Sequence, residues 1–257
     1  MMRGHLLACG VALGLLASCS SIPSKTPERE ALVDEFLERS YLQQETMDEF
    51  KQMISRQSAT VAPPKSEAAA KGRAISQEME EALRPETTVP LMRDYLYTQR
   101  AETLERLLEW LRTPLAQRML ALAAQPFNYE GFNNYQAQKD GPRLELIPRL
   151  DKASHTSELA IEDNAERTKL LESVLAEKQQ AARYDGKVSP MFEQVIRAQH
   201  LRRQAFTYRS VSDQDLREYI EFLESPLGQT YVVVRRNALV AGHSKVQAVL
   251  AKLLTLK

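Results

Sequence analysis

The chain has 257 residues, of which 34 are basic and 34 acidic, so its formal net charge is zero at pH 7. Such a balance argues against nucleic acid as a partner, because binding to the phosphate backbone depends on a concentrated basic surface. Only nine residues are glycine, and 26% are charged. This composition, without convincing alternation of polar and apolar residues, predicts an all-α fold.

The N-terminus has the pattern of a secretory signal. Arg3 precedes an apolar run over residues 6–17, which is too short to span a bilayer as a helix. The run ends in the tetrapeptide LASC at residues 16–19, which resembles the lipobox of bacterial lipoproteins. In such proteins a diacylglycerol is attached to the cysteine before cleavage in front of it, which implies lipidation of Cys19. The alternative is an ordinary signal peptide that happens to contain a cysteine.

The lipobox resemblance implies a domain order and a localisation. Residues 1–18 form the signal peptide, and residues 19–28 form a polar tether to the membrane. Cys9 would leave with the signal, so an acylated Cys19 would be the only cysteine of the mature chain, and no disulfide could form. Ser20 stands where an aspartate would suggest retention at the inner membrane. The resemblance therefore implies an outer-membrane lipoprotein that faces the periplasm.

Helical patterns fill the rest of the chain. Thr26 and Pro27 are suited to open the first helix, because a threonine hydroxyl caps a helix and proline has no N–H to leave unpaired at the first position. We expect a helical bundle with two similar halves, at residues 29–150 and 151–257.

The evidence for two halves is a stretch of sequence that occurs twice. LERLLEWLRTPLAQRM occupies residues 104–119, and LREYIEFLESPLGQTY occupies residues 216–231. Each begins with apolar residues at i, i+3, i+4 and i+7, which form one stripe on a helix. The stripes are Leu104, Leu107, Leu108 and Leu111 in the first copy and Leu216, Tyr219, Ile220 and Leu223 in the second. Trp110 in the first copy matches Phe222 in the second.

A predicted bend follows each stripe. A hydroxyl residue before a proline ends one helix and starts the next, because proline disfavours helical geometry in the preceding residue and the hydroxyl caps the new N-terminus. A small residue then permits close approach of two helices. The matched residues are Thr113, Pro114, Ala116 and Gln117 in the first copy and Ser225, Pro226, Gly228 and Gln229 in the second. We predict an internal repeat of two helix–bend–helix units that superpose in part about a pseudo-two-fold axis.

The second bend also resembles a known family of sequences. The family consists of secreted bacterial proteins catalogued only as a domain of unknown function, and it shares an aromatic-x-x-[Ser/Thr]-Pro-Leu-Gly turn. Here that turn is carried by Phe222, Ser225, Pro226, Leu227 and Gly228. The resemblance covers about half of the chain and implies a helical envelope protein without an assigned activity. The turn either contacts a ligand or serves packing, and prolines and small residues at helix junctions ordinarily serve packing.

The sequence lacks the familiar motifs of catalysis. It has no H-E-x-x-H, G-x-S-x-G or C-x-x-C motif and no phosphate-binding glycine loop. His155, Glu158 and Glu162 could share a helical face as a metal trio, but such a combination also arises by chance in a charged helix. We predict a protein that is not an enzyme and that uses no cofactor and no metal.

Two segments are candidates for binding a partner. Residues 126–136, PFNYEGFNNYQ, mix aromatic rings with asparagines, which suits a contact surface, although the rings could instead fill the seam between the halves. The candidate binding residues are Phe127, Tyr129, Phe132 and Tyr135. A basic cluster either contacts lipid phosphate or an anionic glycan or forms a solvated helix face. Its members are Arg197, His200, Arg202, Arg203 and Arg209.

Three functions from different classes follow from these features. We favour a non-catalytic, lipid-anchored protein whose helical domain binds an envelope protein, glycan or lipid. The second hypothesis is a carrier that holds an apolar small molecule or lipid in a cavity between the two halves. The third is an enzyme with scattered carboxylates, for which the sequence offers no recognisable constellation.

The lipid anchor can be tested at the predicted acceptor. Cys19→Ser removes that thiol, so we expect the variant to lose incorporation of a fatty-acid analogue in metabolic labelling and to leave the membrane fraction. Cys9→Ser, a change inside the apolar run of the signal, should be labelled like the unaltered protein. Unchanged labelling of Cys19→Ser would contradict the predicted anchor.

Overall fold

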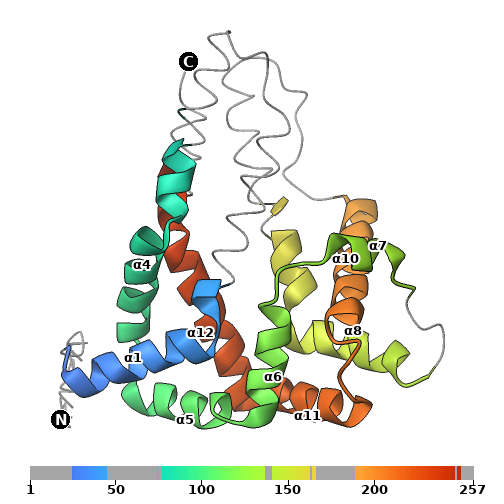
Figure 1. The fold of residues 1–257 in the computed structure, drawn as a ribbon, viewed down its shortest axis with the longest axis horizontal. Helices are drawn as coiled ribbons and strands as arrows, with labels where there is room; N and C mark the ends of the chain where they lie inside the picture. The colour runs from blue at the N-terminus through green and yellow to red at the C-terminus, as the bar shows by residue number, and fades with distance from the viewer. Residues whose placement is uncertain are drawn as a thin grey trace, which may run out of the picture.

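The computed structural model describes residues 25–44, 74, 77–136, 141–162, 164–165, 189–246 and 248–249. Within these residues the regular elements are helices, which confirms the predicted all-α fold (Figure 1). They include α1 (Pro27–Arg39), α4 (Pro85–Tyr97), α5 (Ala101–Leu111), α6 (Pro114–Ala123), α7 (Tyr129–Asn134), α8 (Arg143–Ser154), α10 (Pro190–Thr207), α11 (Asp213–Glu224) and α12 (Pro226–Gly242). No helix among the described residues is both long and apolar enough to cross a bilayer.

The helix starts follow the predicted capping chemistry. The Thr26 hydroxyl accepts a hydrogen bond from the backbone N–H of Arg29 at 3.3 Å, and Pro27 is the first residue of α1. Ser189 and Ser212 cap α10 and α11 in the same way. Because α1 begins at Pro27, the first helix starts inside the predicted tether. The predicted signal peptide, with Cys19, lies outside the described residues.

The helices pack in pairs around one core. α1 lies against α5, α8 lies against α11, and α4 lies along the long helix α12 (Figure 1). Both predicted apolar stripes, on α5 and α11, are buried. The largest fully buried side chains are Phe36, Leu37, Leu42, Met92, Leu96, Leu104, Leu107, Leu108, Leu111, Met119, Leu150 and Leu216.

The hydroxyl residue at each bend caps the next helix, as predicted. Thr113 accepts a hydrogen bond from the N–H of Ala116 at 3.2 Å, and Ser225 accepts one from the N–H of Gly228 at 3.0 Å. Each hydroxyl also donates to a carbonyl oxygen of the preceding helix. One side chain thereby pairs groups that the end of one helix and the start of the next would leave without intrahelical partners.

A glutamine after each bend joins the ends of two other helices. The side-chain amide of Gln117 donates to the carbonyl oxygen of Arg39, in α1, at 3.1 Å and to that of Leu111, in α5, at 2.6 Å. Gln229 donates to the carbonyl oxygens of Ala153, in α8, and of the last turn of α11, at 3.0 and 2.6 Å. Both glutamines therefore satisfy C-terminal carbonyls that have no partner within their own helices.

Two aromatic rings from the matched stretches meet between α5 and α11. The indole of Trp110 stacks on the ring of Phe222 with 3.6 Å between ring centroids and 3° between ring planes. Tyr231 of α12 packs against both rings. The two matched stretches also contact each other through their neighbouring helices at this seam, because α5 of the first contacts α12 of the second and α11 of the second contacts α6 of the first.

The structural similarity between the surroundings of the two bends includes the ends of α1 and α8. It does not continue into the helices that follow the bends. Tyr41 and His155, which follow these helices, have left-handed backbones with φ of 56° and 55°. By contrast, α6 ends at Ala123, whereas α12 continues to Gly242. The superposition of residues 29–150 on residues 151–257 as a whole stays a prediction.

The pairs α1–α5 and α8–α11 each carry an ion pair, and these two ion pairs have opposite polarity. Glu35 of α1 accepts two hydrogen bonds from Arg112 at the end of α5, at 2.9 and 2.6 Å. In the other pair the arginine, Arg149, lies on α8 and donates to Glu224 of α11 at 2.7 and 2.5 Å. The hydrogen bond from Arg112, with a further contribution from Arg39, lowers the pKa of Glu35 to about 2.

The close approach at Gly228 predicts an unusual response to alanine. A Cβ at this position would lie 1.9 Å from the carbonyl oxygen of Phe222 and 2.7 Å from the Cα of Leu223, and these backbone atoms cannot rotate away. Glycine to alanine inside a helix ordinarily stabilises by roughly 0.5–1 kcal/mol. We expect Gly228→Ala instead to lower the free energy of unfolding by about 1–3 kcal/mol, measured by urea titration. Thr230→Ala, in the same helix, controls for helix propensity, and a stabilised Gly228→Ala variant would contradict the close approach.

The ion pair of Glu35 predicts a dependence of stability on pH. The pKa of Glu35 falls from 4.5 to about 2 on folding, so its stabilising contribution is present above pH 4.5 and is lost as the pH falls towards 2. Arg112 is half exposed, so we expect Glu35→Gln to lose only about 1 kcal/mol of unfolding free energy at pH 7. The same variant should show a shallower loss of stability than the unaltered protein between pH 4.5 and 2. Glu105→Gln, at an exposed position of α5, should keep the full slope.

Candidate functional site

The aromatic residues of the segment 126–136 gather around one ring of α10. Phe206 is buried, with 6% of its surface exposed, and its ring centroid lies 5.7 Å from that of Phe132 and 5.5 Å from that of Tyr135. Phe127 lies 6.0 Å from Phe206 and 4.9 Å from Tyr129. These rings therefore fix the short helix α7 and its flanks against α10.

Three arginines of the predicted basic cluster lie over these rings. The guanidinium of Arg202 lies 4.5 Å from the ring centroid of Phe132, and that of Arg203 lies 4.7 Å from Phe127. Arg209 lies 4.0 Å from the ring centroid of Phe206. A cation over an aromatic face at such distances is attracted by the ring quadrupole. We call the five rings and these three arginines the aromatic–arginine face.

Arg202 and Tyr135 also close the end of α7 by hydrogen bonding. Arg202 donates to the carbonyl oxygens of Phe132 at 3.0 Å and of Tyr135 at 3.2 Å, and the Tyr135 hydroxyl donates to the carbonyl oxygen of Ala205 at 3.3 Å. Because the last carbonyls of a short helix lack intrahelical partners, these bonds hold α7 on α10.

The basic cluster divides into paired and unpaired charges. Arg197 donates to Glu158 at 2.6 Å. Burial, together with the nearby charge of Arg203, lowers the pKa of His200 below its usual 6.5, so His200 is neutral at pH 7. In the described part of the chain no carboxylate forms an ion pair with Arg202, Arg203 or Arg209. Three positive charges therefore remain on the aromatic–arginine face.

A hollow of about 350 Å³ opens beside these rings. Its lining combines the rings of Phe127 and Phe206 with neutral hydrogen-bonding side chains and one cation. The polar lining residues are Gln125, Asn128, Thr207 and Arg209. Asn128 is partly committed, because its side-chain oxygen caps α7 by accepting from the N–H of Gly131 at 2.8 Å. Such a lining suits a ligand with an apolar face, several hydroxyl groups and a negative charge.

The placement of residues 126–136 combines features of both interpretations. The segment contacts α10 of the predicted second half, as seam residues would, but its rings remain partly exposed, and Tyr129 is 50% exposed. The central seam is filled by Trp110 and Phe222 instead. The assignment of these rings to partner binding stays a prediction.

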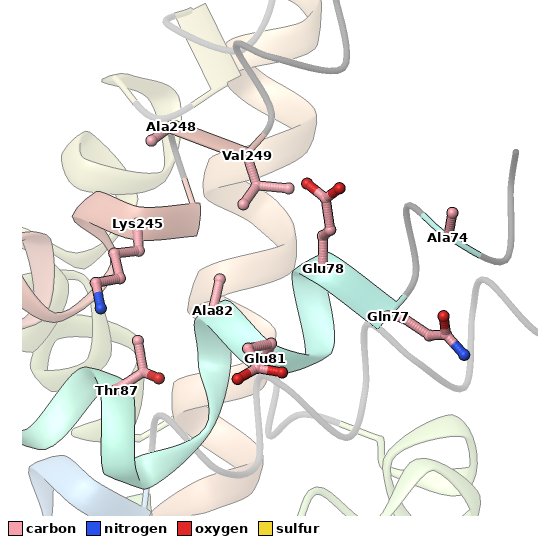
Figure 2. A pocket seen from close by; sticks show the side chains of 9 residues that line it. All are labelled: Ala74, Gln77, Glu78, Glu81, Ala82, Thr87, Lys245, Ala248 and Val249. Atoms are coloured by element: carbon pink, nitrogen blue, oxygen red, sulfur yellow. The ribbon is translucent and has the colours of Figure 1, made fainter.

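A second, larger hollow of about 670 Å³ lies between the helical residues 77–83 on one side and Lys245, Ala248 and Val249 on the other (Figure 2). It joins residues of both predicted halves, which is the position that a carrier would use. Its lining, however, includes Glu78, Glu81 and Lys245 beside the apolar Ala82 and Val249. Figure 2 shows the polar ends of these side chains directed to different sides, so they do not converge on one ligand atom.

The conceivable metal trio is not brought together. His155 has a left-handed backbone at the end of α8, and its Nε2 lies 3.0 Å from Oε1 of Gln229. Glu158 pairs with Arg197, and Glu162 pairs with Arg236 at 2.6 Å. The described residues contain no group of three histidine, cysteine, aspartate or glutamate side chains that could together bind a metal ion.

Comparison with known proteins gives no identification. No family model matches the chain, and neither the curated proteins nor the solved structures include a match. The family resemblance of the second bend therefore stays a prediction, as does the envelope localisation.

Sequence reasoning missed Phe206, which organises the site. Its signal was its place between Arg203 and Arg209 in the cluster, because an aromatic ring among arginines provides a surface for cation–π stacking. The pairing of each arginine with its ring could not be inferred, because Arg202 and Phe132 lie 70 residues apart.

Replacing single rings by alanine distinguishes the buried part of the site from its exposed part by the effect on the free energy of unfolding. Phe206→Ala leaves a cavity beneath α7, so we expect it to lower the free energy of unfolding by about 3–5 kcal/mol in urea titration. Tyr129→Ala, at a half-exposed position, should lower it by no more than about 1 kcal/mol. Equal losses of unfolding free energy in the two variants would contradict the arrangement in which Phe206 is buried and Tyr129 is exposed.

Proposed function

We propose that this protein is a non-catalytic, lipid-anchored protein of the bacterial envelope that binds a partner through the aromatic–arginine face. The observation that carries the proposal is the convergence of the aromatic segment and the basic cluster, which are about 70 residues apart in the sequence, on one hollowed face. Aromatic and arginine side chains are the residues most enriched where proteins bind partners.

The distance between the anchor and the face supports a partner away from the membrane. The segment from Cys19 to Thr26 has eight residues and reaches at most about 29 Å, so the lipid would hold α1 near the bilayer. α1 begins at the lower left of Figure 1, whereas α7 and α10 lie on the right. The aromatic–arginine face thus lies across the molecule from the proposed anchor.

The contacts of the titratable side chains support binding rather than catalysis as the function. Among the described residues, Glu35, Glu158 and Glu224 are engaged by arginines in ion pairs, and His155 is held by Gln229. These contacts stabilise helix packing, and none of them places a nucleophile beside a general base. A carrier would need an apolar cavity, and the mixed charges of the larger hollow do not favour that alternative.

The binding surface can be tested by site-specific photo-crosslinking in cells. A photoreactive phenylalanine analogue at Tyr129 should crosslink to the partner, because this ring is exposed at the centre of the segment. A protein partner gives a band of higher mass, and a cell-wall glycan retains the crosslinked protein in the insoluble cell-wall fraction. The same analogue at Val233, which is exposed on α12, serves as the matched control and should yield neither product. Equal products at the two positions, or none at Tyr129 in a folded protein, would contradict the proposed face.

A further inference from the structure

We propose that the partner of the aromatic–arginine face is a carboxylate-bearing glycan of the bacterial cell wall, bound in the hollow beside Phe127 and Phe206. This inference rests on the proposed function, and it adds the chemical class of the ligand. It is carried by three features of the described residues: unpaired guanidinium groups, a lining of rings and neutral polar groups, and the position of the face on the molecule.

The guanidinium groups supply the sites for an acid. Arginine has five N–H donors in one plane, in a geometry that matches the two oxygens of a carboxylate. Arg203 contacts the ring of Phe127, and Arg209 adds one hydrogen bond, from Nη1 to the carbonyl oxygen of Phe206 at 2.6 Å. Both groups therefore keep donors for the two oxygens of a carboxylate, a pairing that arginine favours.

The hollow fits a sugar ring better than a peptide or a lipid chain. Amide and hydroxyl groups of Gln125, Asn128 and Thr207 can exchange hydrogen bonds with sugar hydroxyls, while Leu122, Pro126 and the ring of Phe127 offer an apolar wall. Two common modes of peptide binding do not suit this face, because an added strand would need a sheet edge and an amphipathic helix would need a long apolar groove. The hollow, at about 350 Å³, is the size of a site for a small rigid ligand.

The same geometry disfavours the lipid surface as the occupant. Phe127, Phe132 and Phe206 are at least half-buried by one another and by the arginines, and Tyr129 is the ring of this group that is most exposed. One exposed ring is a poor wedge for a bilayer interface, where apolar faces insert. The face also lies across the molecule from α1, which the proposed anchor would hold near the membrane (Figure 1).

The test uses the mature chain with Cys19→Ser, purified and soluble, and insoluble cell-wall sacculi as the probe. We expect the protein to sediment with sacculi at low salt and to be released as the salt concentration rises, because the contact is between charges. Arg203→Gln combined with Arg209→Gln should weaken the apparent affinity at least tenfold. Arg106→Gln, which removes an exposed arginine of α5, is the matched control and should bind like the unaltered protein.

Two further experiments distinguish a glycan carboxylate from a lipid phosphate as the group that binds the arginines. Sacculi whose carboxylates have been converted to amides should lose binding, and vesicles of phosphatidylglycerol should not sediment the protein. Binding that survives amidation, equal binding by the double variant, or no binding to sacculi overturns the glycan assignment. Binding to vesicles that the double variant loses also overturns it, in favour of a lipid. A crosslinked protein at Tyr129 without binding to sacculi would overturn the glycan alone and leave the proposed function standing.

Discussion

The hydrogen bonds of Gln117 and Gln229 are the contacts on which the helical arrangement depends. Each side chain follows a bend and donates to the ends of two helices, one adjacent in sequence and one more than 70 residues away. The last carbonyls of a helix have no partner within it, and their burial without one is costly. A single amide at the bend removes that cost for two helices at once, and it thereby fixes where α1 and α8 end relative to α5 and α11.

The two ion pairs add a preference for the correct helix partners. Glu35 lies on α1 and its arginine at the end of α5, whereas Arg149 lies on α8 and its acid at the end of α11. If α1 packed on α11, Glu35 would face Glu224, and if α8 packed on α5, Arg149 would face Arg112. Repulsion between these like charges disfavours the two exchanged pairings, α1 with α11 and α8 with α5. Each exposed ion pair by itself stabilises the fold only slightly.

The aromatic–arginine face exists because the chain departs from the matched pattern after α6. α12 continues for about two turns beyond the length of α6 and packs along α4, whereas α6 ends at Ala123 and α7 turns onto α10. Arg202 then stacks on Phe132 and closes the end of α7, so the same arginines that form the charged surface also hold its aromatic part in place. The proposed binding surface and the local packing therefore share the same side chains, and Phe206 is buried beneath them.

The sequence by itself determined the features that depend on neighbouring residues. Thr26 and Ser225 cap helices at the predicted positions, the stripe from Leu104 to Leu111 is buried, and a small residue is needed at Gly228. These follow from capping chemistry, helical periodicity and the volume of one side chain, all of which act within a few residues. Only the tertiary structure decided that Trp110 stacks on Phe222 and that Arg203 lies over Phe127. The reason is physical: a ring or a guanidinium can satisfy many partners, and the choice among them is set by how distant helices pack, which no local pattern encodes.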